Sequence, residues 1–206
     1  MSCYYWFARA LIRIYLNTLC RLDCRGRGNI PVSGGFILAS NHIAAADPFL
    51  LGSTISRELL FMAKKELFKP RSLGFLMGKL NAFPVDRQGF DLESIKKAIA
   101  VLERGTGLVM FPEGTRSKDG ILQEGKIGVG MLARKVVVPI VPAYLANTKK
   151  AWFNLARGKR LIARMGPPMT ANWIEERANN KEGYKEITEE LMKRIALLGT
   201  QVESGG

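Results

Sequence analysis

Short apolar segments alternate with amphipathic ones along this chain, and this alternation constrains its fold more than any other feature. Strand patterns occupy 34–42, 58–67, 81–87, 107–114, 136–146 and 159–166. Helical patterns occupy 47–56, 72–80, 91–105, 126–135 and 171–198. Strands that alternate with helices favour an α/β fold with a central, mostly parallel or mixed sheet flanked by helices. Because no repeat or linker interrupts the pattern, we expect one domain over 29–206.

Two of the helix starts carry clear signals. Asp47 stands before Pro48, as in an N-cap followed by proline at the first helical position. Asp91 can cap the segment 91–105, whose apolar stripe ends at Gly105. We therefore expect helices to begin close to both aspartates.

The first 28 residues contain no apolar run long enough to span a bilayer. Arg9, Arg13, Asn17 and Arg21 recur every fourth residue and form one polar stripe on a helix, while the other positions are mostly aromatic or aliphatic. A central arginine costs about 2.5–3.5 kcal/mol on insertion scales, which disfavours a spanning helix and a signal peptide. We expect 1–28 to be an amphipathic helix in the membrane interface; a helix packed on the domain is the alternative.

The chain is strongly basic, with 31 Lys and Arg, 18 Asp and Glu and a net charge of +13. No acidic residue occurs between Glu124 and Glu175, a stretch that holds many lysines and arginines. Such a stretch suits an anionic membrane, a phosphorylated substrate or nucleic acid, or is simply a solvated face. The sequence contains no recognisable nucleic-acid-binding module, so we expect no nucleic-acid partner.

Cysteine and histidine are too few for a disulfide framework or a typical zinc site. Cys3, Cys20 and Cys24 cannot all pair within the chain, and His42 is the one histidine. We expect a reducing compartment and neither a metal nor another cofactor.

The segment "NHIAAADP", 41–48, places His42 five residues before Asp47. On one continuous helix these side chains would lie about 140° apart around the axis. If a strand ends near Asn41 and a helix begins at Asp47, the intervening residues can bring the imidazole to the carboxylate. The aspartate can then hold one ring nitrogen while the other acts as a base. The alternative is a helix cap and a structural histidine.

A second polar cluster, "FPEGTRS" over 111–117, directly follows an apolar strand pattern. It brings Glu113, Gly114, Thr115 and Arg116 to one edge of the expected sheet. The guanidinium of Arg116 is suited to phosphate oxygens. A Glu113–Arg116 ion pair that closes a turn is the alternative.

Further basic residues stand at the ends of two other expected strands. Lys64 and Lys65 occur in "AKKEL", and Arg87 ends "FPVDR". Because the strands meet the same edge, these residues predict an anion pocket there.

The order of these segments resembles the glycerolipid acyltransferase family, whose bacterial members acylate lysophosphatidic acid. "NHIAAADP" matches the family's first block, and "AFPVDR", "FPEGTRS" and "VVPIVPAYL" are similar to the next three. The resemblance covers nearly the whole chain after residue 30. Many relatives carry serine two positions after the histidine, where this chain has Ala44.

The resemblance implies transfer of a fatty acyl group from acyl-CoA or acyl carrier protein to the sn-2 hydroxyl of 1-acylglycerol-3-phosphate, giving phosphatidic acid. His42 would act as general base and Asp47 would orient it, with no covalent acyl-enzyme. The implied substrate-binding residues are Lys64, Arg87, Glu113, Gly114, Thr115 and Arg116. Another lysophospholipid, glycerol-3-phosphate, or a non-catalytic lipid-binding role are the alternatives. We expect a peripheral protein on the cytoplasmic face of the cell membrane.

Overall fold

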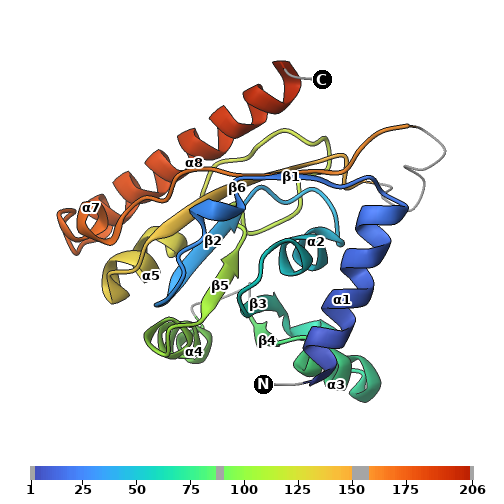
Figure 1. Cartoon of the computed structure of the whole chain (residues 1–206). Helices are drawn as coiled ribbons and strands as arrows, with labels where there is room; N and C mark the ends of the chain where they lie inside the picture. Colours follow the sequence, from blue (N-terminus) through green and yellow to red (C-terminus); the bar gives the residue numbers. More distant parts are fainter. Residues whose placement is uncertain (1–2, 87–90, 150–157, 205–206) are drawn as a thin grey trace.

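The computed structural model describes residues 3–86, 91–149 and 158–204, which form a seven-stranded sheet with helices on both faces (Figure 1). The spatial order is β1-β7-β6-β2-β5-β3-β4. The strands are β1 (Asp23–Arg25), β2 (Phe36–Ser40), β3 (Leu59–Lys64), β4 (Ala82–Val85), β5 (Gly107–Met110), β6 (Ile140–Ala146) and β7 (Ile162–Met165). All described neighbours pair in parallel except β6 and β7, so the expected mixed α/β sheet is confirmed.

Helices cover both faces of the sheet. The α-helices are α1 (Cys3–Thr18), α2 (Asp47–Thr54), α3 (Arg71–Lys79), α4 (Leu92–Glu103), α5 (Gly128–Val136), α7 (Ala171–Glu175) and α8 (Lys181–Ser204), with short 3-10 turns η1 (Arg27–Asn29) and η2 (Lys65–Phe68). Two buried clusters form the core, one under α1 and α2 and the other under α4, α5 and α8.

Strand β2 lies between the two clusters, and all five of its residues are buried. Phe36 and Leu38 belong to the cluster under α1 and α2, whereas Ile37 and Ala39 belong to the other. Successive side chains of a strand point to opposite faces, so a continuous apolar run is what a strand covered on both sides requires. The carboxyl ends of the parallel strands β6, β2, β5, β3 and β4 therefore lie along one edge of the sheet.

Most of the expected helix starts and apolar helix faces are confirmed. Asp91 caps α4 by accepting from the Ser94 amide at 3.0 Å. Hydrogen bonds from the Asp86 amide and from the Ser94 hydroxyl and amide lower the pKa of Asp91 to about 2. In α8, Ile187, Leu191 and Ile195 are fully buried against the sheet.

Three sequence-based expectations for the strands are corrected. Strand β3 ends at Lys64, and the next residues form η2 instead of extending the strand to 67. The strand expected from 136 begins at Ile140, because the Val138 amide bonds the Ala133 carbonyl and Val137 adopts a left-handed cap with φ 53°. Strand β1 was not expected, since three mixed residues carry no periodic signal; it forms because β7 offers a free edge.

The N-terminal helix is shorter than the expected 1–28, and one of its faces packs on the domain. It ends at Thr18, and Asp23 onward joins the sheet. Tyr5 and Leu16 are buried, and the Arg9 guanidinium donates to the carbonyls of Gly52 and Ile55 near the end of α2. Arg9 therefore caps the carboxyl end of α2. An interfacial helix would instead have turned this arginine toward lipid headgroups.

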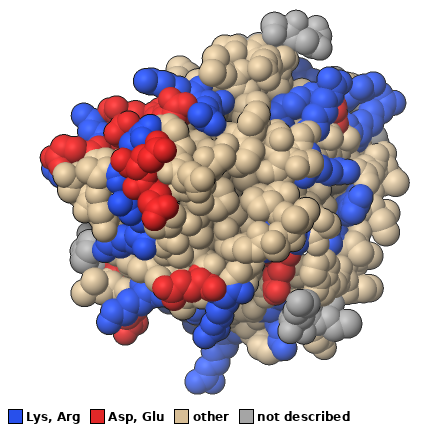
Figure 2. Space-filling view, turned by 60° about the vertical axis from the view of Figure 1, so that its left-hand side comes forward, with Lys and Arg blue, Asp and Glu red and all other residues tan. Residues whose placement is uncertain are grey.

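Charge is unevenly distributed over the surface. On the face drawn in Figure 2, acidic side chains lie mainly toward the left, and a group of lysines and arginines lies at the upper right. Within the ranges described above, no helix is both long and apolar enough to cross a bilayer.

Candidate active site

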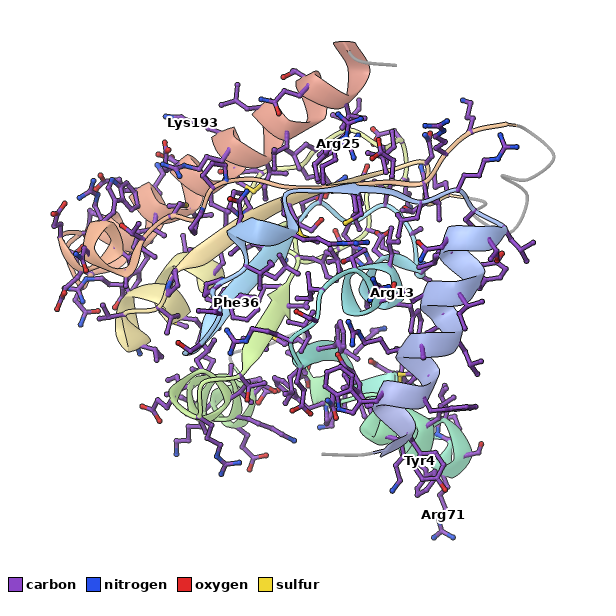
Figure 3. The ribbon with its side chains drawn as sticks, in the orientation of Figure 1. Tyr4, Arg13, Arg25, Phe36, Arg71 and Lys193 are labelled. Carbon is purple, nitrogen blue, oxygen red and sulfur yellow. The ribbon has the colours of Figure 1, made fainter. Side chains whose placement is uncertain are left out.

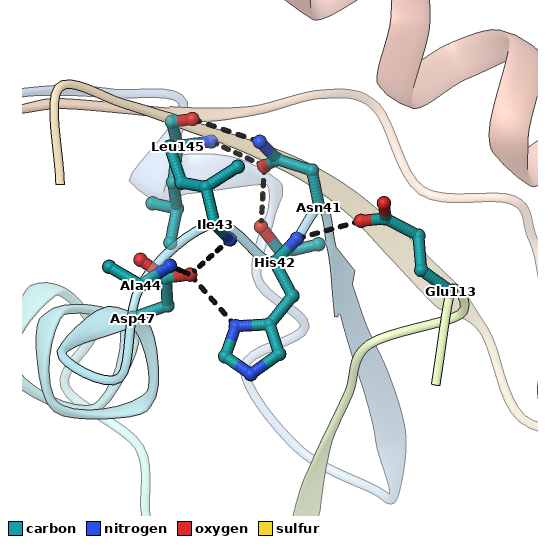
Figure 4. A network of polar contacts seen from close by, with 8 residues as sticks. Asn41, His42, Ile43, Ala44, Asp47, Glu113 and Leu145 are labelled. Carbon is teal, nitrogen blue, oxygen red and sulfur yellow. Dashed lines mark hydrogen bonds and ion pairs between the residues drawn. The ribbon is translucent and has the colours of Figure 1, made fainter. Parts of the chain in front are cut away.

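His42 and Asp47 meet across the bend between β2 and α2 (Figure 4). The strand ends at Ser40 and the helix begins at Asp47, so the intervening loop reverses direction as the sequence suggested. The Nδ1 of His42 lies 2.8 Å from Oδ2 of Asp47. His42 is 7% exposed and Asp47 fully buried, which shields the contact from water.

The carboxylate of Asp47 also organises the loop. Its Oδ2 accepts from the amides of Ile43 and Ala44 at 2.7 and 2.8 Å. Asp47 is the first residue of α2, and Ala46 stands at the N-cap without a capping side chain. The expected cap is therefore wrong: the carboxylate turns back toward the loop and binds the imidazole.

This arrangement determines which ring nitrogen of His42 is available. A carboxylate only accepts, so Nδ1 carries a proton, and in the neutral imidazole the lone pair is then on Nε2. Phe111 stacks on the ring, with centroids 4.0 Å apart and planes inclined by 18°. The imidazole is thus held in place, and its Nε2 makes no hydrogen bond to the described residues.

The loop after β5 is attached to His42 at two points. Oε1 of Glu113 accepts from the His42 amide at 2.8 Å, and the Ser117 amide donates to the His42 carbonyl at 2.8 Å. Oε2 of Glu113 accepts from the Gln123 amide at 3.0 Å. The alternative role of Glu113, an ion pair with Arg116, is not adopted in the described structure, because both carboxylate oxygens hold backbone amides. Residues 114–116 consequently lie beside His42.

Asn41 anchors the other side of the site. Its side chain donates to the Leu145 carbonyl at 3.0 Å and accepts from the Leu145 amide at 2.8 Å. These two bonds continue the pairing of β2 with β6 beyond the last strand residue, Ser40. Asn41 therefore fixes the point at which the chain leaves the sheet, a role that the sequence did not indicate.

The loop 114–116 presents polar groups to solvent. Gly114 has φ 74°, and a β-carbon there would lie 2.9 Å from the Lys126 ammonium. Thr115 and Arg116 are exposed. Lys126 was not among the site residues predicted from the sequence. Its position at the start of the acid-free stretch is the sequence feature that could have indicated it. The Lys126 amide donates to the Pro112 carbonyl.

The two remaining predicted cations are less closely tied to His42. Lys64 stands at the carboxyl end of β3, half exposed, with its ammonium 3.5 Å from Oε1 of Glu66. Arg87 lies outside the described residues. Their substrate-binding roles stay predictions.

An apolar cavity of about 240 Å³ reaches the bend between β2 and α2. Ala45 and Pro48 of the bend form part of its wall. The rest comes from α1, α2, α3, β3, β4 and the adjoining turns, including Phe49, Phe61, Leu73, Met77 and Leu80. Such a cavity is suited to an alkyl chain whose reacting end lies close to His42.

Within the described ranges, no three His, Cys, Asp or Glu side chains are grouped so that they could hold a metal ion. Neither Cys20 nor Cys24 forms a disulfide in the part of the chain that the structure describes. The groups that meet at the bend are an imidazole, a carboxylate and backbone amides.

Comparison with known proteins identifies the family. A family model described as Acyltransferase matches residues 21–146, which include His42, Asp47 and the whole loop 113–117. The chain belongs to this acyltransferase family. The resemblance noted from the four sequence segments is therefore confirmed.

Several curated relatives are named 1-acyl-sn-glycerol-3-phosphate acyltransferase. A Bacillus subtilis 1-acyl-sn-glycerol-3-phosphate acyltransferase is 28% identical over 97% of this chain and 98% of its own length. A protein of that name from Cocos nucifera is 34% identical over 70% of this chain, which spans about half (49%) of that longer relative. The crystal structure of the 1-acyl-sn-glycerophosphate acyltransferase PlsC from Thermotoga maritima superposes with a TM-score of 0.69 at 25% identity, covering 95% of this chain and 78% of that one.

Proposed function

We propose that this acyltransferase moves a fatty acyl group from an acyl thioester to the sn-2 hydroxyl of 1-acyl-sn-glycerol-3-phosphate, producing phosphatidic acid. The contact between His42 and Asp47, made beside an apolar cavity, carries the proposal. The names of the relatives that match nearly the full length of this chain support the choice of acceptor.

His42 acts as the general base. An alcohol is too weak an acid to ionise unaided, so Nε2 takes its proton as the oxygen attacks the thioester carbonyl. Asp47 holds the tautomer and stabilises the imidazolium that forms. When the carbonyl re-forms, the carbon–sulfur bond breaks and the thiolate takes the proton from His42. The acceptor hydroxyl itself is the nucleophile, so no acyl-enzyme forms.

The loop 114–116 binds the polar part of the acceptor. Arg116, with Lys64 and Arg87, neutralises the phosphate, and the geometry adds Lys126 as a further cation at Gly114. Thr115 and Gly114 shape the glycerol site, with Glu113 holding the loop against His42. Amides of residues 114–115 are the candidate donors to the developing oxyanion.

The cavity beside Ala45 and Pro48 receives the donor acyl chain. Burying the chain there leaves its thioester carbonyl at the bend, next to the imidazole. The carrier, coenzyme A or acyl carrier protein, stays outside, where the acid-free basic stretch offers charges to its phosphates.

The outer face of α1 docks the protein on the cytoplasmic membrane surface. Tyr4, Phe7, Leu11 and Ile14 are between 51% and 66% exposed, and Phe75 and Leu76 of α3 continue this apolar surface. The Lys79 ammonium lies over the rings of both Tyr4 and Phe75, which joins the two helices. Figure 3 shows Tyr4 and Arg71 at the same corner of the molecule. Apolar side chains with cations such as Lys79 and Arg71 beside them are suited to an anionic bilayer.

Charge substitutions on this surface test the docking. Phe7→Glu combined with Leu11→Glu is expected to abolish most flotation with liposomes that contain anionic phospholipid, because both side chains would place charges in the acyl region. Leu197→Glu, at an equally exposed apolar position on α8, is the matched control and retains flotation. Equal flotation of both variants would refute the docking surface. Deleting α1 is the poorer test, since its buried face belongs to the core.

Product analysis tests the reaction. Purified protein is supplied with acyl-CoA or acyl carrier protein thioesters and with a panel of acceptors, and thiol release is followed together with product mass spectrometry. We expect phosphatidic acid from 1-acylglycerol-3-phosphate, with much slower turnover of glycerol-3-phosphate and of lysophospholipids that carry a larger headgroup. Absence of turnover with every pair would contradict the enzymatic proposal, and preference for another acceptor would change the substrate.

A further inference from the structure

A large groove lies along β7 and β1, on the face of the sheet that α8 covers, and the mechanism above does not use it. Its volume is about 910 Å³, near the upper end for pockets that bind small molecules. Ala163 of β7 is buried under α1 and α2, so its neighbours Ile162 and Arg164 face the opposite side and line the groove. Leu198 and Val202, in the last turns of α8, form the facing wall.

The groove is strongly basic. Its lining includes Arg25, Lys159, Arg160 and Arg164, with Asp23 as the one carboxylate among the described residues that line it. Nη2 of Arg164 lies 2.5 Å from Oδ2 of Asp23, and Nη1 donates to the Asp23 main-chain carbonyl at 2.9 Å. This pair fixes β1 to β7 and neutralises the carboxylate. Lys159 and Arg160 are exposed and form no ion pair with a described carboxylate. Figure 3 shows Arg25 beside the carboxyl-terminal turns of α8.

One end of the groove lies close to the catalytic bend. Asn147, which lines this end, is two residues beyond Leu145, roughly 7 Å at most along the chain. The main chain of Leu145 is bonded to the side chain of Asn41, the residue before His42. Nδ2 of Asn147 donates to the Arg160 carbonyl at 2.9 Å, which holds the basic residues at the same end. The cations are therefore nearest to the end of the groove that faces the reaction.

We infer that this groove binds the nucleotide end of coenzyme A, and therefore that the acyl donor is a coenzyme A thioester. The inference rests on the proposed function, in which the thioester carbonyl lies at the bend. Lys159 and Arg160 neutralise the phosphates, and Leu198 and Val202 contact the adenosine. The pantetheine arm joins the two sites; it is about as long as five residues of extended chain, roughly 17 Å.

The shape and lining of the groove favour a nucleotide over the surface of a carrier protein. Stable protein interfaces spread over about 800 Å² on each partner. Sites for small molecules are concave and combine apolar walls with a few polar or charged groups, as this groove does. Phosphates account for the cations, and a purine ring accounts for the apolar wall on α8.

Charge reversal at the inner end of the groove tests the assignment. Lys159→Glu combined with Arg160→Glu is expected to raise the KM for palmitoyl-CoA about ten- to thirtyfold at low ionic strength, since each exposed ion pair contributes up to about fivefold. S-palmitoyl-pantetheine carries the same thioester without phosphates or adenosine, so its KM stays close to wild type, as does kcat. Added salt raises the KM for palmitoyl-CoA in the wild type and much less in the variant.

The matched control is Lys181→Glu combined with Lys185→Glu, which changes the net charge by the same amount. Both lysines are exposed at the start of α8, and Lys185 lies about 20 Å from Leu198 along the helix axis. This control is expected to keep the wild-type KM for palmitoyl-CoA. An equal rise in KM for the two double variants would show a general effect of charge and would overturn the groove assignment.

Binding of free coenzyme A separates this inference from the reaction itself. Its affinity, with pantetheine as the reference that lacks phosphates, is measured without an acceptor for the wild type and for Lys159→Glu combined with Arg160→Glu. At least tenfold weaker binding by the variant supports the groove, even if the wild type turns over no donor. Equal affinities would overturn it, even if turnover is normal. Preferred turnover of palmitoyl-acyl carrier protein, lost in the same variant, would instead assign the groove to a protein carrier and overturn the nucleotide.

Discussion

Replacing His42 with alanine is expected to lower kcat for acyl transfer by about 10²- to 10⁴-fold, the range typical of a lost general base. Because Nδ1 contacts Asp47, Nε2 of His42 is the ring nitrogen that can accept the proton of the acceptor hydroxyl. The KM for the thioester should change little, because the cavity proposed for its acyl chain is lined by other side chains. Thiol release from saturating thioester and lysophosphatidic acid measures the loss.

The matched control for this variant is Lys193→Ala. Lys193 is exposed on α8, on the opposite side of the molecule from α1 (Figure 3), and its removal should leave kcat unchanged. Circular dichroism and thermal unfolding establish that both variants fold. Comparable kcat values for His42→Ala and Lys193→Ala would remove His42 from the mechanism.

Asp47→Asn is expected to lower kcat by about 10²- to 10⁴-fold while the fold is retained. The amide oxygen can occupy the place of Oδ2 and still accept from Ile43 and Ala44. Its neutral charge, however, no longer stabilises the imidazolium that forms when the acceptor hydroxyl loses its proton. Steady-state kinetics and thermal unfolding, performed together, separate the two effects.

Asp47→Ala provides the contrast. It leaves two backbone amides and Nδ1 without the carboxylate that they share, so this variant should lose stability as well as activity. Each buried donor left unpaired costs about 1–3 kcal/mol. Activity of Asp47→Asn close to wild type would show that the carboxylate serves only to shape the loop.

Apolar runs and stripes in the sequence predicted their elements correctly, because an element that is buried on one or both faces requires such a pattern. The continuous apolar run at Phe36–Ser40 and the stripe of Ile187, Leu191 and Ile195 are both dictated by the surfaces they cover. Short elements, and elements of mixed polarity, could not be predicted in this way. Asp23–Arg25 and the start of β6 at Ile140 depend on hydrogen bonds to distant or neighbouring backbone that leave no periodic trace.

The sequence by itself determined the α/β class, the candidate pair of His42 and Asp47, and the residues of the loop at 113–117, since each depends on residue type and local spacing. Only the tertiary structure decided what these groups touch. It placed the Asp47 carboxylate against His42 and two loop amides and not at the N-cap of α2, and it committed Glu113 to two backbone amides. Cavities and buried amides arise where segments distant in sequence pack together, so no local pattern can specify them.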